Sequence, residues 1–138
     1  MRQLFAIPLL CALVGCASTD PGTPNMRQQC EERYDRVWVA AQSALSALGA
    51  VTINANRSWG TIQARIDAEV YGAEIELGIT VRRTPDTRVD SLEPLWVEVR
   101  TWDPSTTEPD AHRLETLEMV ARQYLELVGQ RANCGPPM

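Results

Sequence analysis

The spacing of apolar residues changes twice along the chain, and this change limits the folds that it can adopt. Over residues 30–48, apolar side chains recur every three or four positions, as on a helix that lies against a core, and Gly49 follows as a stop. The helical spacing returns over residues 114–128, after the helix-start sequence TEPD and before Gly129. Between these helices, apolar residues alternate with a period of two in four short segments, residues 51–53, 62–66, 73–81 and 95–99.

This order predicts an α+β domain built as helix, four strands, helix. Short turn-rich segments separate the strands, so sequential antiparallel hairpins give the simplest topology, a four-stranded meander. Each helix has one apolar stripe and the strands alternate, so we expect the N-terminal and C-terminal helices to cover one face of the sheet. Two helices on one face bring the ends of the domain together, and Cys30 should then lie near Cys134.

The first sixteen residues have the order of an export signal. Arg2 precedes an apolar run over residues 4–14, and Gly15 and Cys16 follow. A membrane-spanning helix needs about 20 apolar residues, and this run is shorter. Its ending, LVGC, resembles the lipobox of bacterial lipoproteins. The alternative is an ordinary secretory signal with a chance cysteine at its end.

The lipobox resemblance implies that Cys16 is acylated with diacylglycerol after cleavage just before it. Residues 1–15 are then a lipoprotein signal peptide, residues 16–29 the lipidated cysteine and a flexible tether, residues 30–134 the periplasmic domain and residues 135–138 a C-terminal tail. Acyl chains attach such a protein durably to a membrane. By analogy with the sorting of enteric lipoproteins, Ser18 favours the periplasmic face of the outer membrane over the inner membrane.

Two of the four cysteines remain for the folded domain on this interpretation. Cys11 leaves with the signal and Cys16 carries lipid, so Cys30 and Cys134 are left in an oxidising compartment, either as a disulfide or as two unpaired buried thiols. A zinc site needs about four ligands, and His112 is the only histidine. We therefore expect a disulfide and no metal.

Charge and motifs exclude several classes of function. All 13 basic residues are Arg, and removal of Arg2 leaves 12 against 18 acidic residues, a net charge of −6 that disfavours nucleic acid. Without Lys there is no P-loop. His112 is expected on the surface, and Ser58 lacks the G-x-S-x-G motif of a nucleophile elbow. We predict that the protein is not an enzyme and holds no cofactor.

One face of the predicted sheet is the candidate binding surface. If the apolar residues of the last two strands point inward, the alternate residues point outward, and these include Glu76, Trp96, Glu98, Arg100 and Trp102. Exposed tryptophans are typical of interfaces. The two rings either form a partner-binding patch or lie flat over arginine stems as a cover for the sheet.

The remaining tryptophans have simpler interpretations. Trp38 belongs to the apolar stripe of the first helix and is expected in the core. Trp59 precedes Gly60 in a hairpin turn, where we expect a side chain tucked against the domain rather than an exposed contact.

The first helix and the segment after it resemble a known type of domain. The helix pattern VW-x-x-A-x-x-AL, which includes Val37 and Trp38, is followed by a strand, by a turn that ends in GTI at residues 60–62, and by a closing helix after two longer strands. This arrangement resembles the helix-grip domains of BamC-type and related envelope lipoproteins. It implies an accessory or structural protein that binds another envelope component.

A second function is compatible with the same resemblance. A helix-grip domain can carry or sense a small apolar ligand held between its helix and its sheet, which requires an apolar cavity. A void lined by Ile62, Leu77 and Leu125 would favour this carrier. A filled core would favour a binding module.

Overall fold

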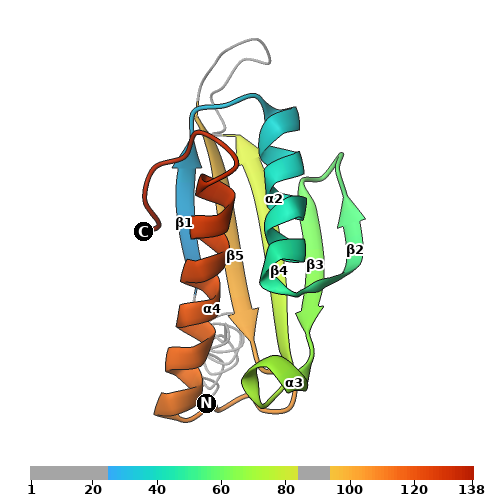
Figure 1. The fold of residues 1–138 in the computed structure, drawn as a ribbon, viewed down its shortest axis with the longest axis vertical. Coiled ribbons are helices and arrows are strands. Elements are labelled where there is room, and N and C mark those ends of the chain that lie inside the picture. The colour runs from blue at the N-terminus through green and yellow to red at the C-terminus, as the bar shows by residue number, and fades with distance from the viewer. Residues whose placement is uncertain (1–24, 84–93) are drawn as a thin grey trace, which may run out of the picture.

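The computed structural model describes residues 25–83 and 94–138, which form an α+β fold with one antiparallel sheet. The sheet has five strands in the order β1-β5-β4-β3-β2, so the predicted number of four is wrong. Figure 1 shows the arrangement of the eight elements described: β1 (Asn25–Cys30), α2 (Tyr34–Leu48), β2 (Val51–Asn56), β3 (Thr61–Ile66), α3 (Ala68–Tyr71), β4 (Ile75–Arg83), β5 (Leu95–Trp102) and α4 (Ala111–Gly129).

The additional strand is β1, which was assigned to the tether and to the start of the first helix. It pairs antiparallel with β5, with Met26 opposite Val99 and Gln28 opposite Val97. Met26, Gln28 and Cys30 point inward and are buried, while the residues between them are exposed. A polar glutamine at a core position hides the period of two in the sequence NMRQQC, and this is why the strand was missed.

The other four strands pair in sequence as an antiparallel meander. Their inward residues build the core, because alternate side chains of β3, β4 and β5 are buried. The segment DAEVYG, which was predicted as a turn, contains the single helical turn α3, and Gly72 ends it at a φ of +79°.

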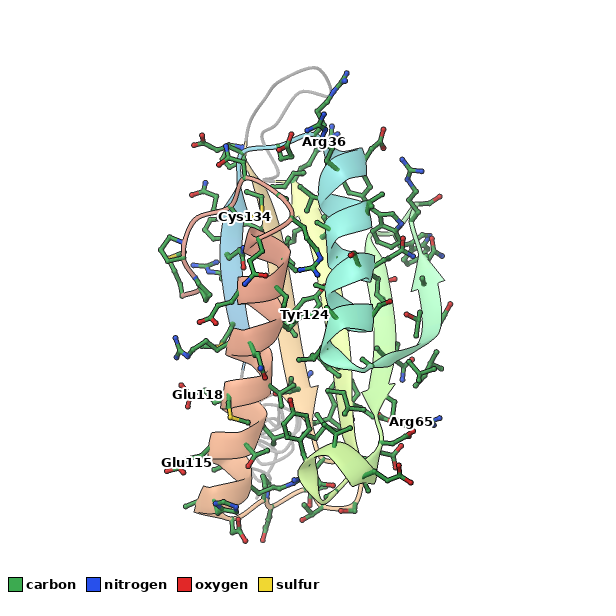
Figure 2. All side chains as sticks on the ribbon, in the orientation of Figure 1. Arg36, Arg65, Glu115, Glu118, Tyr124 and Cys134 are labelled. Carbon is green, nitrogen blue, oxygen red and sulfur yellow. A yellow bond between two sulfur atoms is a disulfide. The ribbon has the colours of Figure 1, made fainter. Side chains whose placement is uncertain are left out.

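The helices α2 and α4 lie side by side in front of the sheet in Figure 1. One polar contact joins them, since the hydroxyl of Tyr124 on α4 donates a hydrogen bond to the carbonyl oxygen of Ala41 on α2 at 3.0 Å. Burial raises the pKa of the Tyr124 hydroxyl and keeps it a donor. Figure 2 shows Tyr124 directed toward α2, while Glu115 and Glu118 point away from the core.

The helix starts differ from those predicted. The first helix begins at Tyr34 rather than near residue 30, because Cys30 belongs to β1. The last helix is capped by Asp110, whose Oδ1 accepts a hydrogen bond from the backbone N–H of Arg113 at 2.8 Å, and not by a threonine.

The predicted cysteine pair lies where the chain's C-terminal tail meets β1. The sulfur atoms of Cys30 and Cys134 are 2.05 Å apart, which is a disulfide bond. The tail then runs along β1, and the N–H of Gly135 donates to the carbonyl oxygen of Gln29 at 2.8 Å. Cys16, the predicted lipidation site, lies outside the described residues.

Candidate functional site

The outward face of β4 and β5 brings together all five residues predicted for the binding surface. In the register of the two strands, Glu76 lies opposite Trp102, and Glu98 lies opposite Thr80. Trp96 and Arg100 share this face, because the intervening residues of β5 are buried in the core. We call these five residues, together with the other residues of β4 that point to the same side, the outward face.

Trp96 is held against the sheet by a residue of β1. The guanidinium carbon of Arg27 lies 4.6 Å from the centroid of the Trp96 ring, a cation–π contact of about 0.5 to 1 kcal/mol at such a partly exposed site. In the β1–β5 register Arg27 lies opposite Glu98, two residues along β5 from Trp96, so it reaches the ring diagonally across the two strands. Sequence reasoning missed Arg27 because it assigned this segment to the tether.

Trp102 packs against β4 at a position that has no side chain. A Cβ built on Gly78 would lie 3.3 Å from Cζ3 of Trp102, so the indole ring packs over this glycine. Trp102 is half-buried, as Trp96 is. Each ring therefore packs against a neighbouring residue and leaves part of its surface open.

Charged side chains accompany the rings on the outward face. Arg82 on β4 forms an ion pair with Glu98 on β5. About half of the Arg82 side chain is exposed, so we assign this pair a stabilisation of at most about 1 kcal/mol. The outward face thus combines two fixed aromatic rings with charges of both signs.

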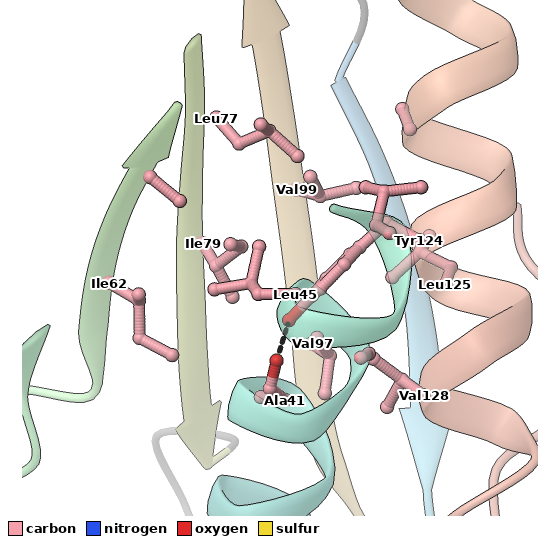
Figure 3. Close-up of a cluster of buried hydrophobic side chains, with 14 of the residues drawn as sticks. Ala41, Leu45, Ile62, Leu77, Ile79, Val97, Val99, Tyr124, Leu125 and Val128 are labelled. Carbon is pink, nitrogen blue, oxygen red and sulfur yellow. Dashed lines mark hydrogen bonds between the residues drawn. The ribbon is translucent and has the colours of Figure 1, made fainter. Parts of the chain in front are cut away.

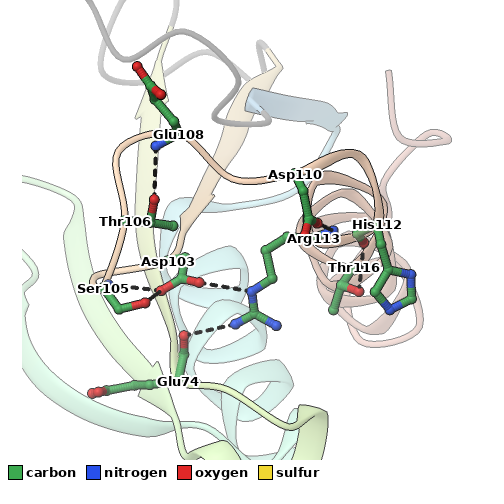
Figure 4. A network of polar contacts seen from close by, with 9 residues as sticks. All are labelled: Glu74, Asp103, Ser105, Thr106, Glu108, Asp110, His112, Arg113 and Thr116. Carbon is green, nitrogen blue, oxygen red and sulfur yellow. Dashed lines mark hydrogen bonds and ion pairs between the residues drawn. The ribbon is translucent and has the colours of Figure 1, made fainter.

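A polar network lies just beyond Trp102, in the segment that joins β5 to α4 (Figure 4). The Oδ2 atom of Asp103 accepts a hydrogen bond from Nε of Arg113 at 3.0 Å, and its Oδ1 accepts bonds from the backbone N–H and the hydroxyl of Ser105 at 2.8 and 2.6 Å. Nη2 of Arg113 also donates to the carbonyl oxygen of Glu74 at 3.2 Å. This network ties the start of α4 to the ends of β4 and β5.

The same network perturbs the acidity of Asp103. Burial acts to raise the pKa of its carboxyl group, but the hydrogen bonds from Ser105 and the contact with the Arg113 guanidinium outweigh burial and hold the pKa below its ordinary value. Asp103 is thus ionised at neutral pH and completes an ion pair in which both side chains are largely covered. The sequence pattern did not predict the pairing of Asp103 with Arg113.

A hollow of about 610 Å³ opens beside Trp102. Trp102 and Asp103 line it together with the following loop and Leu117 of α4. Of its polar lining residues, Ser105 donates to Asp103, and the Thr106 hydroxyl accepts a hydrogen bond from the backbone N–H of Glu108. Trp102 therefore borders both the outward face and this hollow.

The residues named for a ligand cavity are packed into the core. Ile62, Leu77 and Leu125 are all buried, and none of them lines the hollow beside Trp102. Figure 3 shows Tyr124 among these side chains, between the sheet and α2. Tyr124 is among the largest fully buried side chains of this core.

Trp59 is the clearest difference from expectation. We expected it to be tucked into its turn, but it is 79 % exposed. Its backbone N–H donates to Oδ1 of Asn56 at 3.1 Å, which fixes the turn while the side chain points to solvent. Trp38, in contrast, is buried in the core as predicted.

Three further features concern residues 25–83 and 94–138. This part of the chain holds no cluster of three metal-ligating side chains. It contains no helix that is long and apolar enough to cross a membrane. His112 is exposed in the first turn of α4.

Comparison of the chain with protein-family models and with curated proteins gives no match. The outward face is accordingly interpreted from its own residues.

Proposed function

We propose that this protein is a lipid-anchored periplasmic component of the outer membrane that binds another envelope protein and is not an enzyme. The sequence LVGC supports the anchor, with Cys16 as the acylated residue. A helix-grip-like domain, with α2 and α4 on one face of the sheet, leaves the other face for the partner.

The observation that carries this proposal is the pair of half-buried tryptophans on the outward face, each packed against a neighbouring residue. Trp96 is held by Arg27 and Trp102 packs over Gly78, so neither ring loses much freedom when a partner covers it. Large aromatic rings with a charged rim are typical of protein interfaces. Glu76, outward on β4 opposite Trp102, supplies part of that rim.

The same face favours a protein over other partners. Its charges have both signs, because Arg82, opposite Trp96, forms an ion pair with Glu98. A nucleic acid would require a continuous basic surface. A small apolar ligand would require the space in the core that Tyr124 and its neighbours fill.

Crosslinking in intact cells tests the outward face. The native protein is compared with a Trp96→Ala, Trp102→Ala double variant, which we expect to lose its crosslinked partner. The matched control is Met119→Ala, which removes an exposed apolar side chain from α4. Thermal unfolding of all three proteins checks that the double variant is folded. An unchanged set of crosslinked partners would contradict the proposal.

The anchor is tested separately by Cys16→Ser. This variant should leave the membrane fraction and appear as an unlipidated soluble protein, because the thiol that would be acylated is gone. Fractionation of cells that produce either form measures the change. If the variant stays with the outer membrane, the lipoprotein assignment is wrong.

A further inference from the structure

The strand β2 forms an edge of the sheet with no neighbour beyond it in the described residues. All six of its residues are exposed, and Val51 and Ile53 are 53 and 47 % exposed. Its sequence, VTINAN, contains no charged residue and no proline. Charged residues and prolines are two of the features that prevent edge strands from pairing, and of such features β2 has a β-bulge between Thr52 and Asn54.

The opposite edge of the sheet, at β1, is closed by the chain itself. The N–H of Met138 donates to the carbonyl oxygen of Arg27 at 2.8 Å, and the N–H of Arg27 donates back to Met138 at 3.2 Å. The N–H of Gly135 donates to the carbonyl oxygen of Gln29, and the disulfide holds the start of this tail. The tail therefore occupies the edge where a foreign strand would pair, and β2 is left as the open edge of the described sheet.

The hairpin that follows β2 is rigid and displays Trp59 on its turn. The hydroxyl of Tyr34 donates to the carbonyl oxygen of Arg57 at 2.8 Å, and the N–H of Trp59 bonds Asn56. Gly60 adopts a φ of +68°, and its carbonyl oxygen accepts a hydrogen bond from the backbone of β4 at 2.7 Å. These bonds fix the backbone of the turn, so a partner that covers Trp59 would have to order its side chain alone.

These observations indicate which kind of chain segment the edge of β2 would bind. Unpaired backbone donors and acceptors in a row are matched by an extended strand. We propose that β2 pairs antiparallel with β2 of a second copy of this chain, around a two-fold axis near the middle of the strand. No register of this pairing opposes like charges, because the strand has none.

Closure of the other edge explains why assembly would stop at two copies. A two-fold contact uses the same surface on both chains, so a dimer leaves no second β2 edge free. The covered β1 edge offers no site for a third chain. The sheet of the dimer is continuous across β2, and each Trp59 lies past the end of its own strand, toward the start of the partner's strand.

The size of the contact predicts a weak dimer. A stable interface buries about 800 Å² per partner, and one six-residue edge strand with a tryptophan of about 150 to 250 Å² provides less than this. The β-bulge between Thr52 and Asn54 shortens the regular stretch further. We therefore expect dimerisation to depend on protein concentration.

A cysteine scan of β2 in the full chain tests the geometry. Single variants from Val51→Cys to Asn56→Cys are mildly oxidised, and the fraction of disulfide-linked dimer is measured on non-reducing gels. A two-fold axis places equivalent positions near the middle of β2 closest together, so linkage should peak at Ile53→Cys or Asn54→Cys and fall at least several-fold toward both ends. The controls are the parent chain and Met119→Cys. A flat profile, or linkage no greater than in the controls, would overturn the proposal.

Charge substitution provides an independent test that does not depend on oxidation. Ile53→Lys and Ile53→Glu should each abolish dimerisation in sedimentation velocity, and an equimolar mixture should restore it, because the opposed charges then attract. Rescue in the mixture also shows that both variants fold. Val70→Lys, on α3, is the matched control and should dimerise as the native protein does. A native protein that stays monomeric at high concentration would refute the proposal and leave this edge to a strand of a different protein.

Discussion

Replacing Arg113 by methionine tests the polar network between β5 and α4. The substitution keeps most of the aliphatic stem and removes the guanidinium group. Asp103 then loses the ion pair at 3.0 Å but keeps both hydrogen bonds from Ser105. The carbonyl oxygen of Glu74 also loses its donor, because Nη2 of Arg113 is gone.

The expected loss of stability follows from the burial of the pair. Exposed ion pairs contribute about 0 to 1 kcal/mol, whereas removing one partner of a buried pair costs about 3 to 5 kcal/mol. The side chains of Arg113 and Asp103 are 14 and 7 % exposed, but Asp103 lines the open hollow beside Trp102 and is close to water. We therefore expect a loss of about 2 kcal/mol, which lowers the melting temperature by about 6 to 10 °C for a domain of this size.

Urea unfolding at neutral pH, followed by tryptophan fluorescence, measures this loss. A double-mutant cycle with Asp103→Asn isolates the pairwise contribution, since each single variant also disturbs other contacts. The conservative control is Arg122→Met, which breaks an exposed ion pair on α4 and should cost less than about 1 kcal/mol. Equal urea midpoints for native protein and Arg113→Met, or a coupling energy near zero, would refute the reasoning.

The pH dependence has a defined sign. The pKa of Asp103 is lowered in the native state from its ordinary value of 3.8, so the unfolded chain takes up the proton first as pH falls. The contribution of Asp103 to stability is therefore complete above about pH 4 and is lost as pH falls through the lowered native pKa. Asp103→Asn should show a shallower loss of stability in this acidic range, and an unchanged acid profile would contradict this assignment.

Two further predictions concern the ends of the domain and the hairpin turn. The Cys30–Cys134 disulfide spans 104 positions, and its reduction should destabilise the domain by up to about 4 to 5 kcal/mol, because the open unfolded chain has a larger entropy. Urea midpoints with and without reductant measure this loss. Equal midpoints would contradict the prediction. Gly60→Ala should cost about 2 to 3 kcal/mol, because its Cβ would lie 2.2 Å from the carbonyl oxygen of Val81 and its φ is positive. Gly72→Ala has a similar φ but no atom within 4 Å, so it should cost only about 1 kcal/mol, and equal losses for the two variants would show that the close contact has no effect.

The outward face was predictable only in part. The period of two placed Trp96 and Trp102 on one side of β5, because alternation is a local property of a strand. The contacts that hold them, from Arg27 and from above Gly78, depend on which strands are neighbours. Arg27 in particular requires β1, whose buried Gln28 concealed its pattern.

The sequence by itself determined the α+β class, the antiparallel order of β2 to β5 and the approach of Cys30 to Cys134. The fold class and the strand order follow from hydrophobic periods and turn residues, which act over short distances along the chain, whereas the cysteine pair was expected from the number of cysteines left in the domain and from the packing of two helices on one face. Only the tertiary structure decided that a fifth strand joins β5, that the tail closes one edge while β2 stays open, and that Trp59 points to solvent. The fifth strand and the closed edge depend on pairing between segments far apart in sequence, and the local pattern of either segment does not encode its partner.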